Sequence, residues 1–166
     1  MPVAPAGAAS RPLVLFDAIL KKLTAPERTA AGPDDLQVAV AVLLIEAARM
    51  DDRFETAERA VIEHLLAAKF ELSPESTKVL MEKAETTAAQ TSQLYPFTRL
   101  AVEKMTPDQR IKLIEMLWEV AYADGVLDPE EDVLLRRVAG LIYVSDHDRV
   151  AARQRVLARM GQKPAN

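Results

Sequence analysis

The chain has 166 residues, of which 49% are hydrophobic and 28% are charged, and its formal net charge at pH 7 is −4. This length and composition indicate one globular domain, or two small halves that share a core. The acidic balance gives no sign of the clustered Lys and Arg that nucleic acid binding requires. The absence of cysteine excludes disulfides, thiolate metal sites and cysteine nucleophiles.

Residues 1–12 are rich in Ala and Pro and lack the basic start of a signal peptide, so they predict a disordered lead and, by default, a cytoplasmic protein. No run of about 18 apolar residues exists that would predict a membrane-spanning helix. Apolar residues recur instead at spacings of three and four, and no alternating run indicates a strand. The pattern predicts an all-α fold of about seven to eight helices, near 13–23, 34–50, 56–70, 74–90, 94–104, 107–123, 129–143 and 146–160. We expect one domain over 13–160, with halves at roughly 33–90 and 94–160, and a flexible tail at 161–166.

The predicted helices begin at recognisable capping signals. Thr106 is followed by Pro107 at the first helical position and by Gln109, which can reach back to the cap. Asp128 and Glu131 repeat this capping box with acids. Ser73 and Ser145 predict two further caps, and Gly32-Pro33-Asp34-Asp35 predicts a start with Pro at the first position and acids in the first turn.

Two segments of the chain, 46–58 and 119–131, are near copies of each other, 73 residues apart. In each, an apolar helix ends at an acid, a short turn carries a second acid, and the next helix opens with a third. The aligned acids are Glu46 with Glu119, Asp51 with Asp124, Glu55 with Asp128, and Glu58 with Glu131. A duplicated helix–turn–helix predicts a fold of two pseudo-repeated halves.

The acids of these turns favour two alternative roles. As oxygen ligands, Asp124, Asp128 and Glu131, with Asp51, Glu55 and Glu58 as their equivalents, would suit a hard cation such as Ca²⁺ or Mg²⁺. The string 124–131 matches the back half of an EF-hand loop, but the front half, which includes Val120 and Tyr122, is apolar. In the other role the acids only hold helices: Asp128 caps, Gly125 ends the preceding helix, and Asp124 accepts a hydrogen bond from the next helix.

The segment 117–131, with its weaker copy ending Arg49-Met-Asp-Asp-Arg-Phe-Glu55, resembles the tellurite-resistance TerB family, and within it the uncharacterised bacterial branch. The resemblance covers roughly residues 13–158. It implies an all-helical fold of two pseudo-repeated halves and a cytoplasmic location, and it implies divalent cation binding at the six acids named above. Asp52 departs from the glycine that the family favours in the first turn.

The resemblance also implies a stress-response role, because related domains occur beside DnaJ-like cochaperone modules and in membrane-associated stress complexes. We therefore expect a non-enzymatic interaction domain with protein partners, no nucleic acid and at most a peripheral membrane association. The alternative is a structural adaptor or cochaperone-type module without metal. A metal-dependent hydrolase would need an open coordination position, a general base and a cleft, none of which the sequence indicates.

Two further groups of side chains favour structural roles. Trp118 and Tyr122, four apart on one helix, and Tyr95 and Phe97 at the start of another, predict core packing. The last helix carries four arginines, which predict a solvated face or, alternatively, a docking stripe for an acidic partner or membrane surface. They are Arg149, Arg153, Arg155 and Arg159.

Overall fold

Seven α-helices and one short 3₁₀ helix make up the part of the chain that the computed structural model describes, residues 32–51 and 56–161. They are α2 (Asp35–Ala48), η1 (Arg49–Asp51), α3 (Thr56–Phe70), α4 (Pro74–Gln90), α5 (Tyr95–Lys104), α6 (Pro107–Ala121), α7 (Pro129–Leu141) and α8 (Asp146–Arg159). No strand occurs within these ranges, so the predicted all-α fold is confirmed. The predicted lead 1–12, the predicted helix 13–23 and residues 162–166 of the predicted tail lie outside the described residues.

The helix starts follow the capping signals, with one correction. Thr106 Oγ1 accepts from the Gln109 N–H at 3.2 Å and Gln109 Oε1 accepts from the Thr106 N–H at 2.9 Å, which is the predicted capping box. At the start of α2, however, the cap is Asp34, which forms its own capping box with Gln37. Pro33 therefore precedes the cap and does not occupy the first helical position, where it was predicted.

The α3–α4 and α7–α8 connections are structural copies. Glu71 and Tyr143 adopt positive φ angles of 53° and 59°, and each is followed two residues later by a capping serine, Ser73 or Ser145. Matching backbone bonds close the two helix ends, from the Leu72 N–H to the Ala67 carbonyl at 3.0 Å and from the Val144 N–H to the Ala139 carbonyl at 2.9 Å. Such bonds around a left-handed residue are typical of Schellman-type helix ends. The repeat thus extends past the acidic turns, and α2–α3–α4 corresponds to α6–α7–α8.

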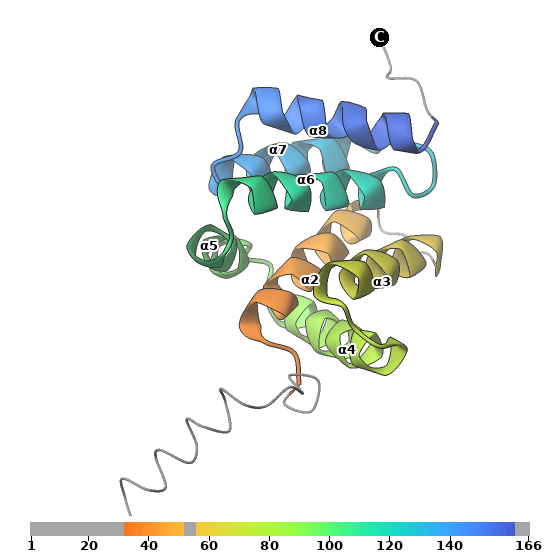
Figure 1. Ribbon diagram of the computed structural model, residues 1–166, viewed down its shortest axis with the longest axis vertical. Helices are drawn as coiled ribbons and strands as arrows, with labels where there is room; N and C mark the ends of the chain where they lie inside the picture. Colours follow the sequence, from red (N-terminus) through yellow and green to blue (C-terminus); the bar gives the residue numbers. More distant parts are fainter. Residues whose placement is uncertain (1–31, 52–55, 162–166) are drawn as a thin grey trace, which may run out of the picture. The chain divides into compact units, whose positions relative to one another are not determined.

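The core is organised around α2, which packs against α3, α4, α5, α6 and α7. Every residue from Val38 to Ile45 is buried, so this helix is apolar around its whole circumference, as expected for a helix inside a core. Within the two repeats the most extensive packing joins α2 to α4 and α6 to α8. Figure 1 shows α6, α7 and α8 running alongside one another, with α2 approaching α6 from the side of α3 and α4.

The aromatic residues divide between core and surface. Trp118 is fully buried, and its indole N–H donates to the Arg149 carbonyl at 3.1 Å. Its ring stacks on Tyr122 with the centroids 5.9 Å apart, and Phe97 is also buried. Tyr95 is 64% exposed, so the prediction that it packs in the core is wrong. It occupies the first position of α5.

Candidate functional site

The turn after α6 is held by Asp124 and Gly125. Gly125 has φ of +84°, the left-handed conformation that the sequence predicts for the residue ending this helix, and its N–H donates to the Tyr122 carbonyl at 2.9 Å. Asp124 Oδ1 accepts from the Val126 N–H at 3.0 Å. Val126 belongs to the turn itself, so the prediction that the next helix donates this hydrogen bond is wrong. Asp124 is exposed, which leaves its carboxylate accessible to solvent.

Asp128 caps α7, but without the reciprocal pattern that was predicted. Its Oδ1 accepts from the Glu130 N–H at 2.9 Å, whereas a capping box requires the N–H of the third helical residue, Glu131. The Glu131 N–H donates instead to the Asp128 backbone carbonyl at 3.0 Å. Asp128 is therefore a simple helix cap, and its side chain remains partly exposed at the rim of the turn.

Glu58 and Glu131 hold equivalent positions in the two repeats and are both turned inward. Each is the third residue of its helix, α3 or α7, and each is only 3% exposed. Burial of a carboxylate is expensive unless hydrogen bonds or charges compensate for the lost hydration. Burial of the equivalent acid in both repeats therefore characterises the repeat better than the exposed Asp124 does. The sequence did not distinguish the buried acids from the exposed one.

The described part of the first acidic turn, η1, contacts the second repeat. The 3₁₀ helix η1, which ends at Asp51, packs against α7, whose cap is Asp128. The side chain of Asp51 and the whole of Glu55 are outside the described residues. Among the side chains that the structure describes, no group of three or more His, Asp or Glu residues is close enough together to hold a metal ion.

A family model described as tellurite resistance protein TerB matches residues 37–154, which run from α2 into α8 and include both acidic turns. The chain belongs to the TerB family. The predicted resemblance is thereby confirmed. Comparisons of this TerB-family chain with curated proteins and with solved structures found no match. None of the described helices is both long enough and apolar enough to cross a membrane.

The arginines of α8 in this TerB-family protein have intramolecular partners. Arg153 Nε donates to the Tyr122 hydroxyl at 2.7 Å, and its guanidinium lies over both the Trp118 and Tyr122 rings. Arg155 binds Glu115 at 2.6 Å and Arg159 binds Glu119 at 2.7 Å, both across the α6–α8 contact. Arg149 is buried and lies 3.4 Å from the Asp146 carboxylate. Arg153, Arg155 and Arg159 therefore join α8 to α6 and its capping residue Tyr122, whereas the Arg149 pair lies within α8.

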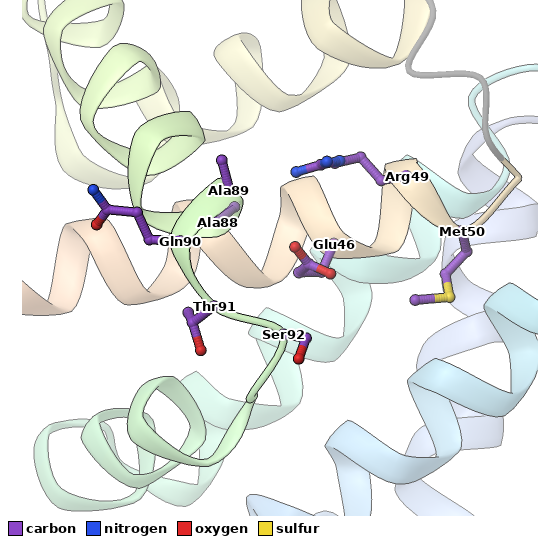
Figure 2. Close-up of a pocket in the computed structure, with 8 residues that line it drawn as sticks. All are labelled: Glu46, Arg49, Met50, Ala88, Ala89, Gln90, Thr91 and Ser92. Carbon is purple, nitrogen blue, oxygen red and sulfur yellow. The ribbon is translucent and has the colours of Figure 1, made fainter.

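A second candidate site, which the sequence did not indicate, is a pocket of about 470 Å³ at the end of α2 (Figure 2). Its walls are Glu46 of α2, Arg49 and Met50 of η1, and residues 88–92 at and beyond the end of α4. Partial burial raises the pKa of the Glu46 carboxyl above its ordinary value of 4.5, and the positive charge of Arg49 opposes this rise. The alignment of Glu46 with Glu119 was the only sequence feature that pointed to this position. The pocket itself could not be predicted from it, because its walls include the end of α4, which lies beside α2.

Proposed function

We propose that this TerB-family chain is a non-enzymatic cytoplasmic stress-response domain that binds a divalent cation, Ca²⁺ or Mg²⁺, at its two acidic turns and so controls its contact with a protein partner. The observation that carries the proposal is the packing of η1, ending at Asp51, against α7, capped by Asp128. This packing supports a site to which acids of both turns contribute oxygens. Ca²⁺, for example, takes roughly six to eight oxygen ligands.

The chemistry of the residues fits this class of ion. All six predicted ligands are carboxylates, and the chain has no cysteine that would favour a softer metal. Asp124 and Asp128 each accept one backbone N–H bond, while an ionised carboxylate offers about four lone-pair positions. Each can therefore hold its turn and also bind a cation. The described residues alone supply no group of three ligands, so the proposed site requires Asp51 or Glu55 as well.

The second candidate function is a structural adaptor or cochaperone-type interaction module in which no metal binds. The same two hydrogen bonds favour it, because the bond of Asp124 to Val126 and that of Asp128 to Glu130 give both acids a structural task. In this alternative the exposed carboxylates only fix the α6–α7 turn, and the partner recognises the helices.

The two candidates separate in a thermal unfolding experiment on chelator-treated protein, with and without millimolar Ca²⁺, Mg²⁺, Mn²⁺ or Zn²⁺. The test variant is Asp51→Asn/Asp124→Asn. The control is Glu82→Gln/Glu103→Gln, which removes the same charge from exposed positions on α4 and α5. Cation binding at about 100 times Kd should stabilise the native state by roughly 2.7 kcal/mol, a rise of several degrees for a domain of this size.

A rise specific to one cation in the wild type and the control, and its loss in the test variant, supports the cation site. If no cation stabilises the wild type, and the test variant is less stable under every condition, the acids act as helix clips and the adaptor alternative is favoured. A rise that the test variant retains places the cation elsewhere and overturns the proposed site.

A further inference from the structure

Two equivalent glutamates, one in each repeat, have different surroundings. In the second repeat, Glu119 of α6 binds the Arg159 guanidinium of α8 at 2.7 Å. In the first repeat Glu46 of α2 takes the place of Glu119, and α4 takes the place of α8. Counted from the capping serines Ser73 and Ser145, the residue of α4 that corresponds to Arg159 is Thr87. Its hydroxyl donates to the Lys83 carbonyl of its own helix at 2.8 Å.

Glu46 consequently faces a pocket where Glu119 faces an arginine. No salt bridge to Glu46 occurs among the residues that the structure describes. The last turn of α4 forms one wall, because α4 has 17 residues whereas α8 has 14. Figure 2 shows Glu46 beneath Arg49, whose side chain extends toward the α4 end, with Thr91 and Ser92 lining the opposite side.

The pocket is rich in groups that accept hydrogen bonds. The last three residues of α4 line the pocket, and a helix C-terminus carries carbonyls without intrahelical partners and the negative end of the helix dipole. Thr91 and Ser92 add hydroxyl oxygens, and Glu46 adds a partly buried carboxylate. Arg49 is the one cation of the lining, and its charge acts on Glu46, but no salt bridge joins the two among the described residues. The Glu46 carboxylate therefore keeps accepting positions for a second planar donor, and a guanidinium can bind a carboxylate through two parallel bonds.

We propose that the Glu46 pocket binds a guanidinium group, supplied either by a small molecule or by an arginine side chain of a partner protein. The proposal goes beyond the cation site proposed above and uses none of its six acids. The second repeat provides the intramolecular precedent, since the equivalent glutamate already accepts a guanidinium from the neighbouring helix.

The test is an NMR titration of the ¹⁵N-labelled full chain with two guanidinium probes and one ammonium probe. N-butylguanidine represents a free small molecule, N-acetyl-arginine N-methylamide represents a side chain on a peptide, and butylamine represents a simple ammonium, and all three carry a single positive charge. We expect guanidinium binding with a Kd on the order of 1 mM, with the largest shifts at the amides of Thr91 and Ser92. Glu46→Gln should weaken binding about tenfold, whereas Glu82→Gln, an equal charge change at an exposed position of α4, should not.

A second variant makes the test independent of the loss of Glu46. Thr87→Arg places a tethered guanidinium where the second repeat has Arg159, and its high effective concentration should exclude both guanidinium probes. We also expect this variant to unfold at a higher temperature than the wild type. The probe that binds more tightly identifies the source of the guanidinium, and binding of either supports the proposal.

Three results would overturn the proposal. One is the absence of shifts at residues 88–92 with either guanidinium probe. Another is equal weakening by Glu46→Gln and Glu82→Gln, which would show that the net charge alone attracts the probes. The third is binding of butylamine as tightly as N-butylguanidine, which would show that the pocket does not select the planar group.

Discussion

Arg153 of α8 donates a 2.7 Å hydrogen bond from Nε to the hydroxyl of Tyr122, the C-terminal capping residue of α6. The same guanidinium lies 5.5 Å from the centroid of the Trp118 ring and 5.8 Å from that of Tyr122. One side chain therefore joins the last helix to both aromatic residues that precede the second acidic turn.

Removal of the Tyr122 hydroxyl should destabilise the protein by about 1 kcal/mol, the usual net value of one hydrogen bond, and somewhat more because the donor is charged. Urea unfolding of Tyr122→Phe, followed by far-UV circular dichroism, measures this loss. The control is Tyr95→Phe, since Tyr95 is largely exposed and should give no change. An equal loss in the two variants would argue against a stabilising Arg153–Tyr122 bond.

Truncation of the buried indole should be far more costly. Trp118→Ala removes a ring with no exposed surface and the indole hydrogen bond to the Arg149 carbonyl, so we expect a loss of about 3–5 kcal/mol. The measurement is again the urea midpoint. A loss below about 1 kcal/mol would contradict the close packing of the α6–α8 contact.

The two capping serines should contribute equally, because the α3–α4 and α7–α8 connections are copies. Ser73 accepts from the Ser76 N–H and Ser145 from the Asp148 N–H, both at 3.1 Å. Ser73→Ala and Ser145→Ala should each lower the free energy of unfolding by about 1 kcal/mol. Thr86→Ala, an exposed change within α4, should be neutral or slightly stabilising because alanine is the better helix former. Unequal losses for the two serines would show that the connections differ in energy.

The stability contributed at Glu46 should depend on pH. Since burial raises the pKa of the Glu46 carboxyl above 4.5, with Arg49 opposing, the folded protein binds this proton more tightly than the unfolded chain. At pH values above the pKa of Glu46 in the folded protein, the ionised carboxylate therefore lowers the free energy of unfolding. At pH values below its pKa in the unfolded chain, the carboxyl is protonated in both states and this loss of stability is absent. Glu46→Gln should raise the melting temperature at pH 7 and change it little at pH 4. A variant that is less stable than the wild type at pH 7 would contradict this sign.

The local structure of the helices was predictable from the sequence, and most contacts between them were not. Thr106, Ser73 and Ser145 each determine a helix start through a bond within the first turn, so the signal lies within a few neighbouring residues. The roles of Arg153 and Arg159 depend on side chains of another helix, which no spacing within α8 reveals. For the same reason the sequence could not separate the exposed Asp124 from the buried Glu131.

The continuous burial of α2 has a consequence for how the chain folds. Residues Val38–Ile45 are kept from solvent by helices of both repeats, so neither repeat alone can bury this stretch of α2. We therefore expect the two repeats to gain and lose their structure in a single cooperative transition, with amide protons of α2 exchanging only on global unfolding. A chain cut between α4 and α5 should yield fragments that aggregate separately and regain structure only when mixed.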